Sequence, residues 1–141
     1  DLADAEVAER QTEAVLEQFE DATILERTVR YVDAACPGTA CCVRADYENG
    51  VAGASALGEK GKPAEEVGHE AADEVCSFKG TGAAVDRYLA DQLLVFLAAA
   101  GGEIAIPAMT DHVETSLALF EAFGETIETR DEDGTVVLRA G

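Results

Sequence analysis

Hydrophobic and polar residues follow two different periods along this chain. In some segments apolar residues recur every three to four positions, which is the spacing of an amphipathic helix. Other, shorter segments are rich in β-branched residues or alternate between apolar and polar positions, as strands do. The pattern predicts helices over residues 3–20, 63–78, 84–100 and 111–123, and strands over residues 24–32, 40–47, 51–57, 103–107, 125–130 and 135–139.

Turn-forming residues divide the predicted elements into two groups. The pair Asn49-Gly50 favours a tight hairpin between the second and third predicted strands. A Gly-Thr-Gly sequence at 80–82 predicts a short flexible joint. We therefore expect two domains, residues 1–79 with the element order αβββα and residues 80–141. Strands that alternate with helices and end in a hairpin predict an α/β fold, specifically an α+β sandwich with a mixed or antiparallel sheet.

The composition indicates a folded protein with a substantial core, because 48% of the 141 residues are hydrophobic. The longest apolar run, residues 93–100, predicts a buried helix and falls short of the roughly 18 residues that a membrane span needs. No basic-then-apolar leader is present in the sequence. We expect a cytoplasmic protein with no membrane partner. The chain begins at Asp1 inside a helical pattern, so we expect it to be a fragment of a longer protein.

The charge is strongly acidic, with 29 acidic and 10 basic residues and a net charge of −19. Such a charge repels nucleic acid, whose binding usually depends on Lys and Arg at the phosphates. The acids are spread along helices and turns, and the apolar periodicity persists, so disorder is not expected. The low-lysine, acid-coated pattern resembles proteins of salt-loving organisms, where molar salt shortens the Debye length to about 3 Å. An acidic protein of ordinary cells is the alternative.

The cysteines do not follow a zinc-binding pattern, because their spacing contains no C-x-x-C pair. Two interpretations stay open. The thiols are buried and reduced in a cytosolic protein, or a disulfide crosses the Pro-Gly turn between the first two cysteines. The residues concerned are Cys36, Cys41, Cys42 and Cys76. No residue of this chain is predicted as a metal ligand.

His112 is the candidate for catalytic chemistry. We predict that Asp111 caps the helix 111–123, with Glu114 three residues later completing a capping box. His112 then lies in the first helical turn, where free N–H groups and the helix dipole favour a bound phosphate. The dipole also favours a neutral imidazole, which is a potential nucleophile. The alternative is an exposed histidine without a task, and His69 in the acidic helix 63–78 is predicted to be solvated.

Three polar residues near the start of helix 84–100 are candidates for ligand binding. Tyr88, Asp91 and Gln92 are spaced i, i+3 and i+4 and therefore share one helical face. A tyrosine ring can stack on a base while Asp and Gln bond to base or ribose edges. The alternative is a surface pair between Arg87 and Asp91, with the Tyr88 ring packed on the core.

These motifs resemble those of the RNA 3'-terminal phosphate cyclases. Residues 82–85 and 98–102 and the run Tyr88-Leu89-Ala90-Asp91-Gln92-Leu93 are similar to one helix of that family, and residues 111–120 to the part that bears its nucleophilic histidine. Residues 3–19 and 58–78 resemble, more loosely, the family's inserted small domain. The resemblance implies that residues 1–79 are this insert and that residues 80–141 are the last part of a repeated βαβαββ catalytic domain. With the acidic composition, it suggests the C-terminal part of a cyclase from a halophilic archaeon.

The resemblance implies a ligase that uses ATP to convert an RNA 3'-terminal phosphate into a 2',3'-cyclic phosphodiester. His112 would be the catalytic residue that accepts AMP, forming an adenylyl-histidine. A divalent metal ion, Mg²⁺ or Mn²⁺, would accompany the nucleotide, and RNA 3'-phosphate ends would be the partner. The residues implied to line the nucleotide site are Tyr88, Leu89, Ala90, Asp91 and Gln92.

Two departures from the family pattern limit this interpretation. The Gly-rich N-terminal signature and the basic nucleotide-binding residues of the family are not in this chain, so the isolated fragment is expected to be inactive. Asp111 and Glu114 disfavour a phosphate beside His112 unless Asp111 caps the helix and salt screens both. The rival hypothesis is a non-catalytic, cyclase-like protein that binds RNA or ribosome-assembly partners; an unrelated acidic α/β binding domain is a third. An exposed sheet edge makes a homo-oligomer possible.

Overall fold

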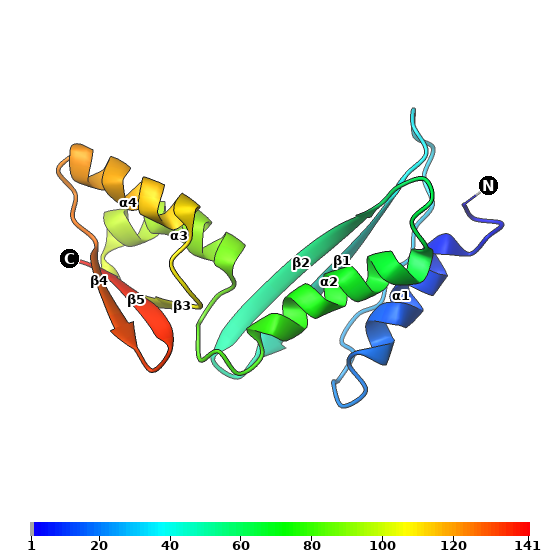
Figure 1. Cartoon of the computed structure of the whole chain (residues 1–141), viewed down its shortest axis with the longest axis horizontal. Coiled ribbons are helices and arrows are strands. Elements are labelled where there is room, and N and C mark those ends of the chain that lie inside the picture. The colour runs from blue at the N-terminus through cyan, green and yellow to red at the C-terminus, as the bar shows by residue number, and fades with distance from the viewer. Residues whose placement is uncertain (1) are drawn as a thin grey trace. The chain divides into compact units, whose positions relative to one another are not determined.

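The computed structural model describes residues 2–141, which form four helices and five strands in two separate sheets (Figure 1). The α/β class predicted from the sequence pattern is confirmed. The helices are α1 (Val7–Glu17), α2 (Ala64–Phe78), α3 (Arg87–Ala100) and α4 (Asp111–Ala122). The strands are β1 (Thr39–Tyr47), β2 (Gly50–Gly58), β3 (Gly102–Ile106), β4 (Glu128–Glu132) and β5 (Thr135–Ala140).

The chain divides into two compact units. Unit 1 comprises the residues up to Arg44 together with Gly53–Ser77, and unit 2 comprises Ala45–Ala52 and Phe78–Gly141. The β1–β2 hairpin is shared, because its tip belongs to unit 2 and the rest of it to unit 1. Each unit has its own buried residues and is described by itself.

Unit 1 is built from small residues packed closely between α1, α2 and the hairpin. Gly68 of α2 lies against α1 so tightly that a Cβ atom there would be 2.2 Å from the carbonyl oxygen of Gln11. The Gln11 side chain is itself buried and donates from Nε2 to Thr39 Oγ1 at 2.6 Å. At the surface, Arg10 forms a bidentate pair with Glu65, at 2.7 and 2.9 Å. The buried apolar side chains are Ala14, Val15, Ala56, Ala64, Val67, Ala71, Ala72 and Val75.

The strand predicted over residues 24–32 is not formed, which corrects the order αβββα to αββα. Residues 23–34 are neither helix nor strand. Tyr31 instead fixes this segment to α1, because its hydroxyl accepts from the Ala8 N–H at 3.2 Å and donates to the Glu9 carboxylate. Strand propensity alone does not supply a backbone partner, and the sheet of unit 1 contains only β1 and β2. Helix α1 is also shorter than predicted and begins after Glu6, which has a left-handed φ of 48°.

The predicted hairpin between β1 and β2 is confirmed, with Glu48 and Asn49 as its loop residues. Its tip requires glycine at position 50, since a Cβ atom there would lie 2.7 Å from the carbonyl oxygen of Ala83. The next residue, Val51, donates its N–H to the Ala84 carbonyl at 3.0 Å. This contact gives the chain leading into α3 a fixed backbone partner.

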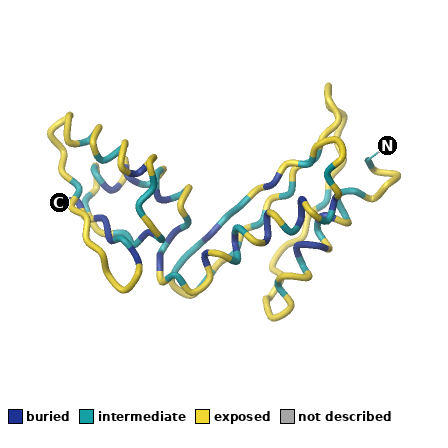
Figure 2. The backbone as a smooth tube through the Cα atoms, in the orientation of Figure 1, coloured by how far each residue is buried: buried dark blue, intermediate teal, exposed yellow. Residues whose placement is uncertain are grey.

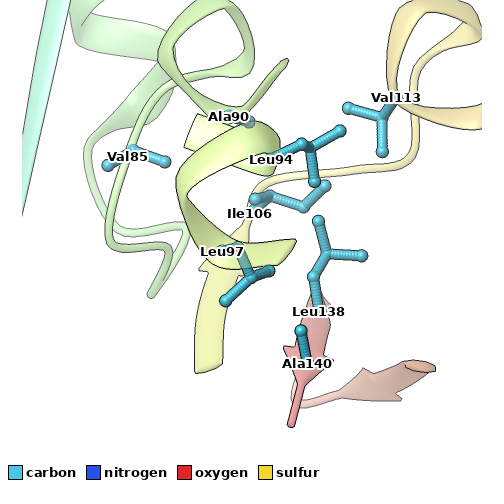
Figure 3. Packing of buried hydrophobic residues seen from close by; sticks show 8 residues of the cluster. All are labelled: Val85, Ala90, Leu94, Leu97, Ile106, Val113, Leu138 and Ala140. Carbon is cyan, nitrogen blue, oxygen red and sulfur yellow. The ribbon is translucent and has the colours of Figure 1, made fainter. Parts of the chain in front are cut away.

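Unit 2 is a three-stranded antiparallel sheet with two helices on one face. The strand order is β3-β5-β4, so the C-terminal strand is central. In Figure 3, Leu94 of α3 points toward Ile106 of β3 and Val113 of α4, and Leu138 of β5 lies close to Ile106. These four side chains are almost completely buried. They fix the positions of both helices on the sheet.

An ion-pair bridge crosses the other face of this sheet. Arg130 of β4 contacts Glu132 at 2.9 Å and reaches over β5 to Glu103 of β3 at 3.2 Å. Both carboxylates raise the pKa of Arg130. The largest cause is the hydrogen bond to Glu132, and the charge of Glu103 adds to it. Val137 lies between the two strands in the pairing register and is buried. The long Arg side chain thus spans an apolar position with a charged head, as such side chains commonly do.

The prediction of a buried helix over residues 93–100 is wrong for one face of α3. Leu94 and Leu97 are buried, but the intervening Val95 and Phe96 are 61% and 67% exposed. Figure 2 shows the same change between buried and exposed positions along α3 and α4. An apolar run contains no periodicity, so the sequence could not show that this helix is covered on one side only.

The four thiols are free in the structure, and the Cys36–Cys41 disulfide alternative is not formed. Cys36 and Cys42 are exposed, which corrects the prediction of buried thiols, while Cys41 and Cys76 are half-buried. Burial, and then the neighbouring Cys42, raises the pKa of Cys41.

No helix within residues 2–141 has the length and apolar character to cross a membrane.

Candidate functional site

The predicted ligand-binding residues lie in the first two turns of α3, and Asp86 determines where that helix begins. Its carboxylate oxygen Oδ1 accepts from the N–H groups of Tyr88 and Leu89, both at 2.8 Å. This is a typical N-cap arrangement, and it satisfies two of the N–H groups that a helix start leaves unpaired. Helix α3 therefore begins at Arg87, three residues later than the predicted start.

The five residues predicted to line the nucleotide site do not share one environment. Tyr88 is 53% exposed and Gln92 is also exposed, one turn further along the same face. Leu89 and Asp91 are half-buried. Ala90 is 1% exposed and belongs to the core of unit 2 (Figure 3). A ligand on α3 would therefore meet the side chains of Tyr88, Asp91 and Gln92.

Arg87 adds a positive charge to this face, and the sequence analysis did not assign it a site role. Its guanidinium carbon lies 4.7 Å from the centroid of the Tyr88 ring, and it donates to the Tyr88 hydroxyl at 2.7 Å. A cation over an aromatic ring is attracted to the ring's negative face. A basic residue in the first turn of a helix is disfavoured by the helix dipole. That local conflict in the sequence was the signal that could have identified Arg87.

Asp91 links α3 to α4. Its oxygen Oδ1 accepts a hydrogen bond from Ser116 Oγ at 3.0 Å. The sequence pattern offers an Arg87–Asp91 pair as the alternative to ligand binding and does not indicate Ser116 as a partner. The two residues are 25 positions apart, so no local pattern connects them.

The N-cap of α4 is Thr110 rather than the predicted Asp111. Thr110 has an extended backbone, with φ −119° and ψ 159°, and its Oγ1 accepts from the Val113 N–H at 3.3 Å. Asp111 is the first residue of the helix. Thr and Asp are both good caps, so adjacent candidates cannot be ranked from sequence. Asp111 and Glu114 are both in the first turn, where negative charge stabilises the helix dipole.

His112 is exposed at the second position of α4 and is followed by Val113, which is fully buried in the core. The Thr110 cap and the Val113 anchor thus fix the backbone on either side of the imidazole. Helix geometry leaves the N–H groups of the first turn without intrahelical partners, which favours an anion at this end. The exposed carboxylates of Asp111 and Glu114 oppose an anion there.

The structure brings the two sets of predicted residues to the same end of a helix pair. Helices α3 and α4 run side by side in the same direction (Figure 1). Tyr88 is one turn before Asp91 on α3, and His112 is one turn before Ser116 on α4. The Asp91–Ser116 hydrogen bond therefore joins the two helices next to the turns that carry Tyr88 and His112. Chemically, this end offers an imidazole, an aromatic ring, a guanidinium, an amide and a carboxylate.

The other histidine lies in a different environment. His69 of α2 is half-buried, and its Nε2 lies 3.4 Å from Glu17 Oε2. It lines a shallow acidic hollow with Glu66, Glu70, Asp73 and Glu74. The residues that line this hollow include four acids and no lysine or arginine, and the nearby Lys62 is paired with Glu70. Among residues 2–141, no group of three or more His, Cys, Asp or Glu is arranged to hold a metal ion.

Comparison with known proteins gives a consistent match. A family model for the insert domain of RNA 3'-terminal phosphate cyclase (RTC) matches residues 3–78. The RNA 3'-terminal phosphate cyclase of Halobacterium salinarum (strain ATCC 29341 / DSM 671 / R1) is 42% identical over 140 residues, which are 99% of this chain and 40% of the relative. The protein of that name from Thermococcus kodakarensis is 41% identical over 133 residues, 92% of this chain and 39% of the relative. This chain thus spans about 40% of the length of these curated relatives.

The family-model match and the match to the Halobacterium protein differ in whether they include the predicted site. Residues 3–78 contain none of the residues singled out on α3 and α4. The match to the Halobacterium protein covers nearly the whole chain and so includes both helices. The assignment of the family rests on both matches, and the roles of single residues stay predictions.

Proposed function

Because this chain belongs to the RNA 3'-terminal phosphate cyclase family, we propose that the whole protein converts an RNA 3'-terminal phosphate into a 2',3'-cyclic phosphodiester. Here the whole protein is a protein of the full length of these relatives that contains this chain. The proposed reaction consumes ATP, which places the enzyme in the ligase class. The observation that carries the proposal is His112, exposed at the N-terminal turn of α4 beside the start of α3.

In the proposed mechanism, His112 is a nucleophile. A neutral imidazole nitrogen attacks the α-phosphorus of ATP, a P–N bond forms, and the P–O bond to pyrophosphate breaks. The RNA 3'-phosphate oxygen then displaces the histidine and takes the AMP. Finally the adjacent 2'-hydroxyl attacks the RNA phosphorus, loses its proton and releases AMP, which closes the cyclic phosphate. A covalent intermediate divides one difficult displacement into easier steps.

The side chains of α3 have separate tasks in this proposal. The Tyr88 ring provides a surface for the adenine base. Gln92 and Asp91, one turn further along α3, provide hydrogen-bonding groups for the base or ribose. Arg87, held over Tyr88, supplies a positive charge near the phosphates. Ala90 contributes through its place in the core, which keeps α3 on the sheet.

A divalent ion is part of the proposal only as a companion of the ATP phosphates. The described residues offer no cluster of metal-ligating side chains, so the groups present do not fit a resident metal. Mg²⁺ or Mn²⁺ would arrive with the nucleotide and reduce its charge. We therefore assign no step of the mechanism to a metal held by residues 2–141.

The setting that fits this proposal is the cytoplasm of a salt-loving cell. Four free thiols fit a reducing compartment. A net charge of −19 would oppose both RNA and ATP at low ionic strength. Molar salt would screen this repulsion, because the Debye length falls to about 3 Å. A homo-oligomer stays a prediction.

A second function is favoured by the acids that flank His112. Asp111 and Glu114 are exposed within the first turn of α4 and repel a phosphate group. In a non-catalytic, cyclase-like protein, the same surface would bind a ribosome-assembly partner without a covalent step, and RNA would be bound by residues away from these acids. This alternative predicts no transfer of AMP to the protein.

The experiment that separates the two functions measures covalent labelling by ATP. The whole protein is incubated in molar KCl with Mg²⁺ and ATP labelled at the α-phosphate, beside the variants His112→Ala and His69→Ala. We expect acid-labile, alkali-stable label on the wild type and on His69→Ala, and none on His112→Ala. His69→Ala is the matched control because it removes the other histidine of the chain.

Each other outcome has a definite meaning. Absence of label from folded wild-type protein would favour the non-catalytic function. Label on His112→Ala as well would show that a residue other than His112 is the nucleophile, and the protein would still be an enzyme.

A further inference from the structure

Two neighbouring hydroxyl groups on α4 bond in different ways. Thr115 donates from Oγ1 to the Asp111 carbonyl at 2.7 Å, which is the usual bond of a hydroxyl within a helix, four residues back. Ser116 donates instead across to α3, where Asp91 Oδ1 accepts at 3.0 Å. A serine hydroxyl has one proton to donate. In Ser116 that proton fixes a carboxylate on the next helix.

The environment strengthens this bond. Ser116 and Asp91 are both half-buried, and a hydrogen bond to a charged group that is partly shielded from water is stronger than one at an open surface. The helices themselves are held by Leu94 and Val113, which are buried in the common core (Figure 3). The bond therefore forms between two rigid elements and sets the orientation of the Asp91 side chain.

A carboxylate fixed in this way keeps capacity for a ligand. An ionised Asp can accept about four hydrogen bonds over its two oxygens. Ser116 occupies one position on Oδ1, which leaves Oδ2 to face other donors. Asp91 lies one turn after Tyr88 on α3, at the i, i+3 spacing of neighbours on a helix surface. A molecule stacked on Tyr88 would present its hydroxyl or amino groups to this oxygen.

We propose that Ser116 is a positioning residue of the nucleotide site: it holds Asp91 so that Oδ2 accepts a hydrogen bond from a donor group of the nucleotide. The inference rests on the proposed function for the identity of the ligand. It assigns to Ser116 a role that acts through Asp91, without contact between Ser116 and the nucleotide. The covalent step at His112 does not enter the argument.

The test measures binding separately from chemistry. The dissociation constant for α,β-methylene-ATP, which cannot release pyrophosphate, is determined for the whole protein in molar KCl with Mg²⁺. The variants are Ser116→Ala, Ser116→Thr and the matched control Thr115→Ala. We expect Ser116→Ala to raise the dissociation constant about fivefold, an effect in the range of one lost hydrogen bond. Ser116→Thr keeps the hydroxyl and should stay within about twofold, and Thr115→Ala should leave the constant unchanged.

A double-mutant cycle distinguishes positioning from a general structural role. If Ser116 acts through Asp91, then Ser116→Ala should add no further loss of affinity to Asp91→Ala. Thermal unfolding of each variant is measured in parallel. A lower unfolding temperature with an unchanged dissociation constant would overturn the proposal, because the bond would then serve stability only. Equal, additive losses from Ser116→Ala in both backgrounds would also overturn it.

The same measurements test the proposed function separately from the role of Ser116. Binding of the analogue by a wild-type protein that takes no label from ATP would refute the covalent step, and the Ser116 comparison would still decide the inference. A folded wild type that does not bind the analogue would overturn both.

Discussion

The two units of this molecule keep their shape by different means. In unit 2, large apolar side chains such as Leu94, Ile106 and Leu138 are almost completely buried between a sheet and two helices. In unit 1, the buried side chains are mostly alanine and valine, α1 and α2 touch through Gly68, and surface ion pairs surround the contact. Burial of large apolar groups involves no charge, whereas exposed ion pairs are weakened by salt and depend on pH. Unit 2 therefore offers the firmer support for a site that needs fixed side chains.

The comparison also separates what identifies the family from what suggests the chemistry. The family model matches residues 3–78, which lie mainly in unit 1. The candidate nucleophile and the candidate nucleotide-binding residues lie in unit 2. A match to a family can thus rest on a region with no candidate site residue. The predictions below test whether the two units differ as their cores indicate.

The largest effect is expected from removing a large side chain from the core of unit 2. Leu94→Ala should lower the free energy of unfolding by about 2–5 kcal/mol, the range for a buried leucine that leaves a cavity. The neighbouring Val95 is 61% exposed. Val95→Ala should therefore change the free energy of unfolding by less than about 0.5 kcal/mol. Urea unfolding, followed by circular dichroism, measures both variants. Similar losses of stability for both variants would contradict the one-sided burial of α3.

The next effect is expected where the helices of unit 1 touch. Gly68→Ala places a Cβ atom 2.2 Å from the Gln11 carbonyl oxygen and 2.8 Å from the Ala14 side chain. Because the first of these neighbours is backbone, α1 must shift, and we expect a loss of about 1–3 kcal/mol from this overpacking. Gly38→Ala is the control, since a Cβ atom there meets nothing within 4 Å. Thermal unfolding of the two variants decides the point, and equal stabilities would show that the helices are less tightly packed.

How much of this architecture the sequence predicts depends on whether the cause is local. Helices α3 and α4 and strands β3 and β5 lie within three residues of their predicted bounds, because caps and periodicity are local features. The segment 24–32 has strand-like residues, but a strand needs a partner elsewhere in the chain, and Tyr31 attaches the segment to α1. Local pattern could not foresee that attachment.

The candidate site shows the same limit. His112 was placed in a first helical turn from the cap signal before it, and Tyr88, Asp91 and Gln92 were placed on one face from their spacing. The roles predicted for them came from the family resemblance. The role of Ser116 was missed because its hydrogen bond to Asp91 crosses between helices. The N-cap of α4 was predicted to be Asp111 and is Thr110, because two residues suited to capping stand side by side.

A smaller effect is expected from salt, and it should differ between the units. The net charge of −19 makes the folded chain repel itself, and this repulsion is screened as the Debye length falls from about 10 Å at 0.1 M to about 3 Å at 1 M. We expect the midpoint of thermal unfolding to rise between 0.1 M and molar KCl. Hydrogen exchange should show the smaller gain of protection in unit 1, because the same salt weakens the exposed ion pairs around its helix contact. An equal gain in both units would contradict the difference drawn between them.

The smallest effect is expected at the attachment of segment 24–32 to α1. The hydrogen bond from Tyr31 lowers the pKa of Glu9 below its ordinary value of 4.5, and the same bond raises the pKa of Tyr31 above 10.0. The lowered pKa means that the bond contributes fully above pH 4.5 and is lost as the pH falls through the pKa that Glu9 has in the folded state. The raised pKa of Tyr31 means that the contribution is fully present below pH 10.0 and is lost as the pH rises through the raised value.

The NMR shift of the Ala8 amide, which donates to the Tyr31 hydroxyl, follows this attachment directly. We expect a transition at acid pH, below the ordinary titration of glutamate. The variant Tyr31→Phe lacks the hydroxyl and should show no such transition. A transition that persists in Tyr31→Phe would mean that another group reports at Ala8.

The central claim is that the rigid core of unit 2 holds a nucleophilic histidine at the first turn of α4. Its most direct test is peptide mapping by mass spectrometry of the whole protein after incubation with ATP and Mg²⁺ in molar KCl, under alkaline conditions that preserve a phosphoramidate. We predict that AMP is found on the peptide that contains His112, attached to that histidine. AMP on a different residue, or none on a folded protein that binds ATP, would contradict the account.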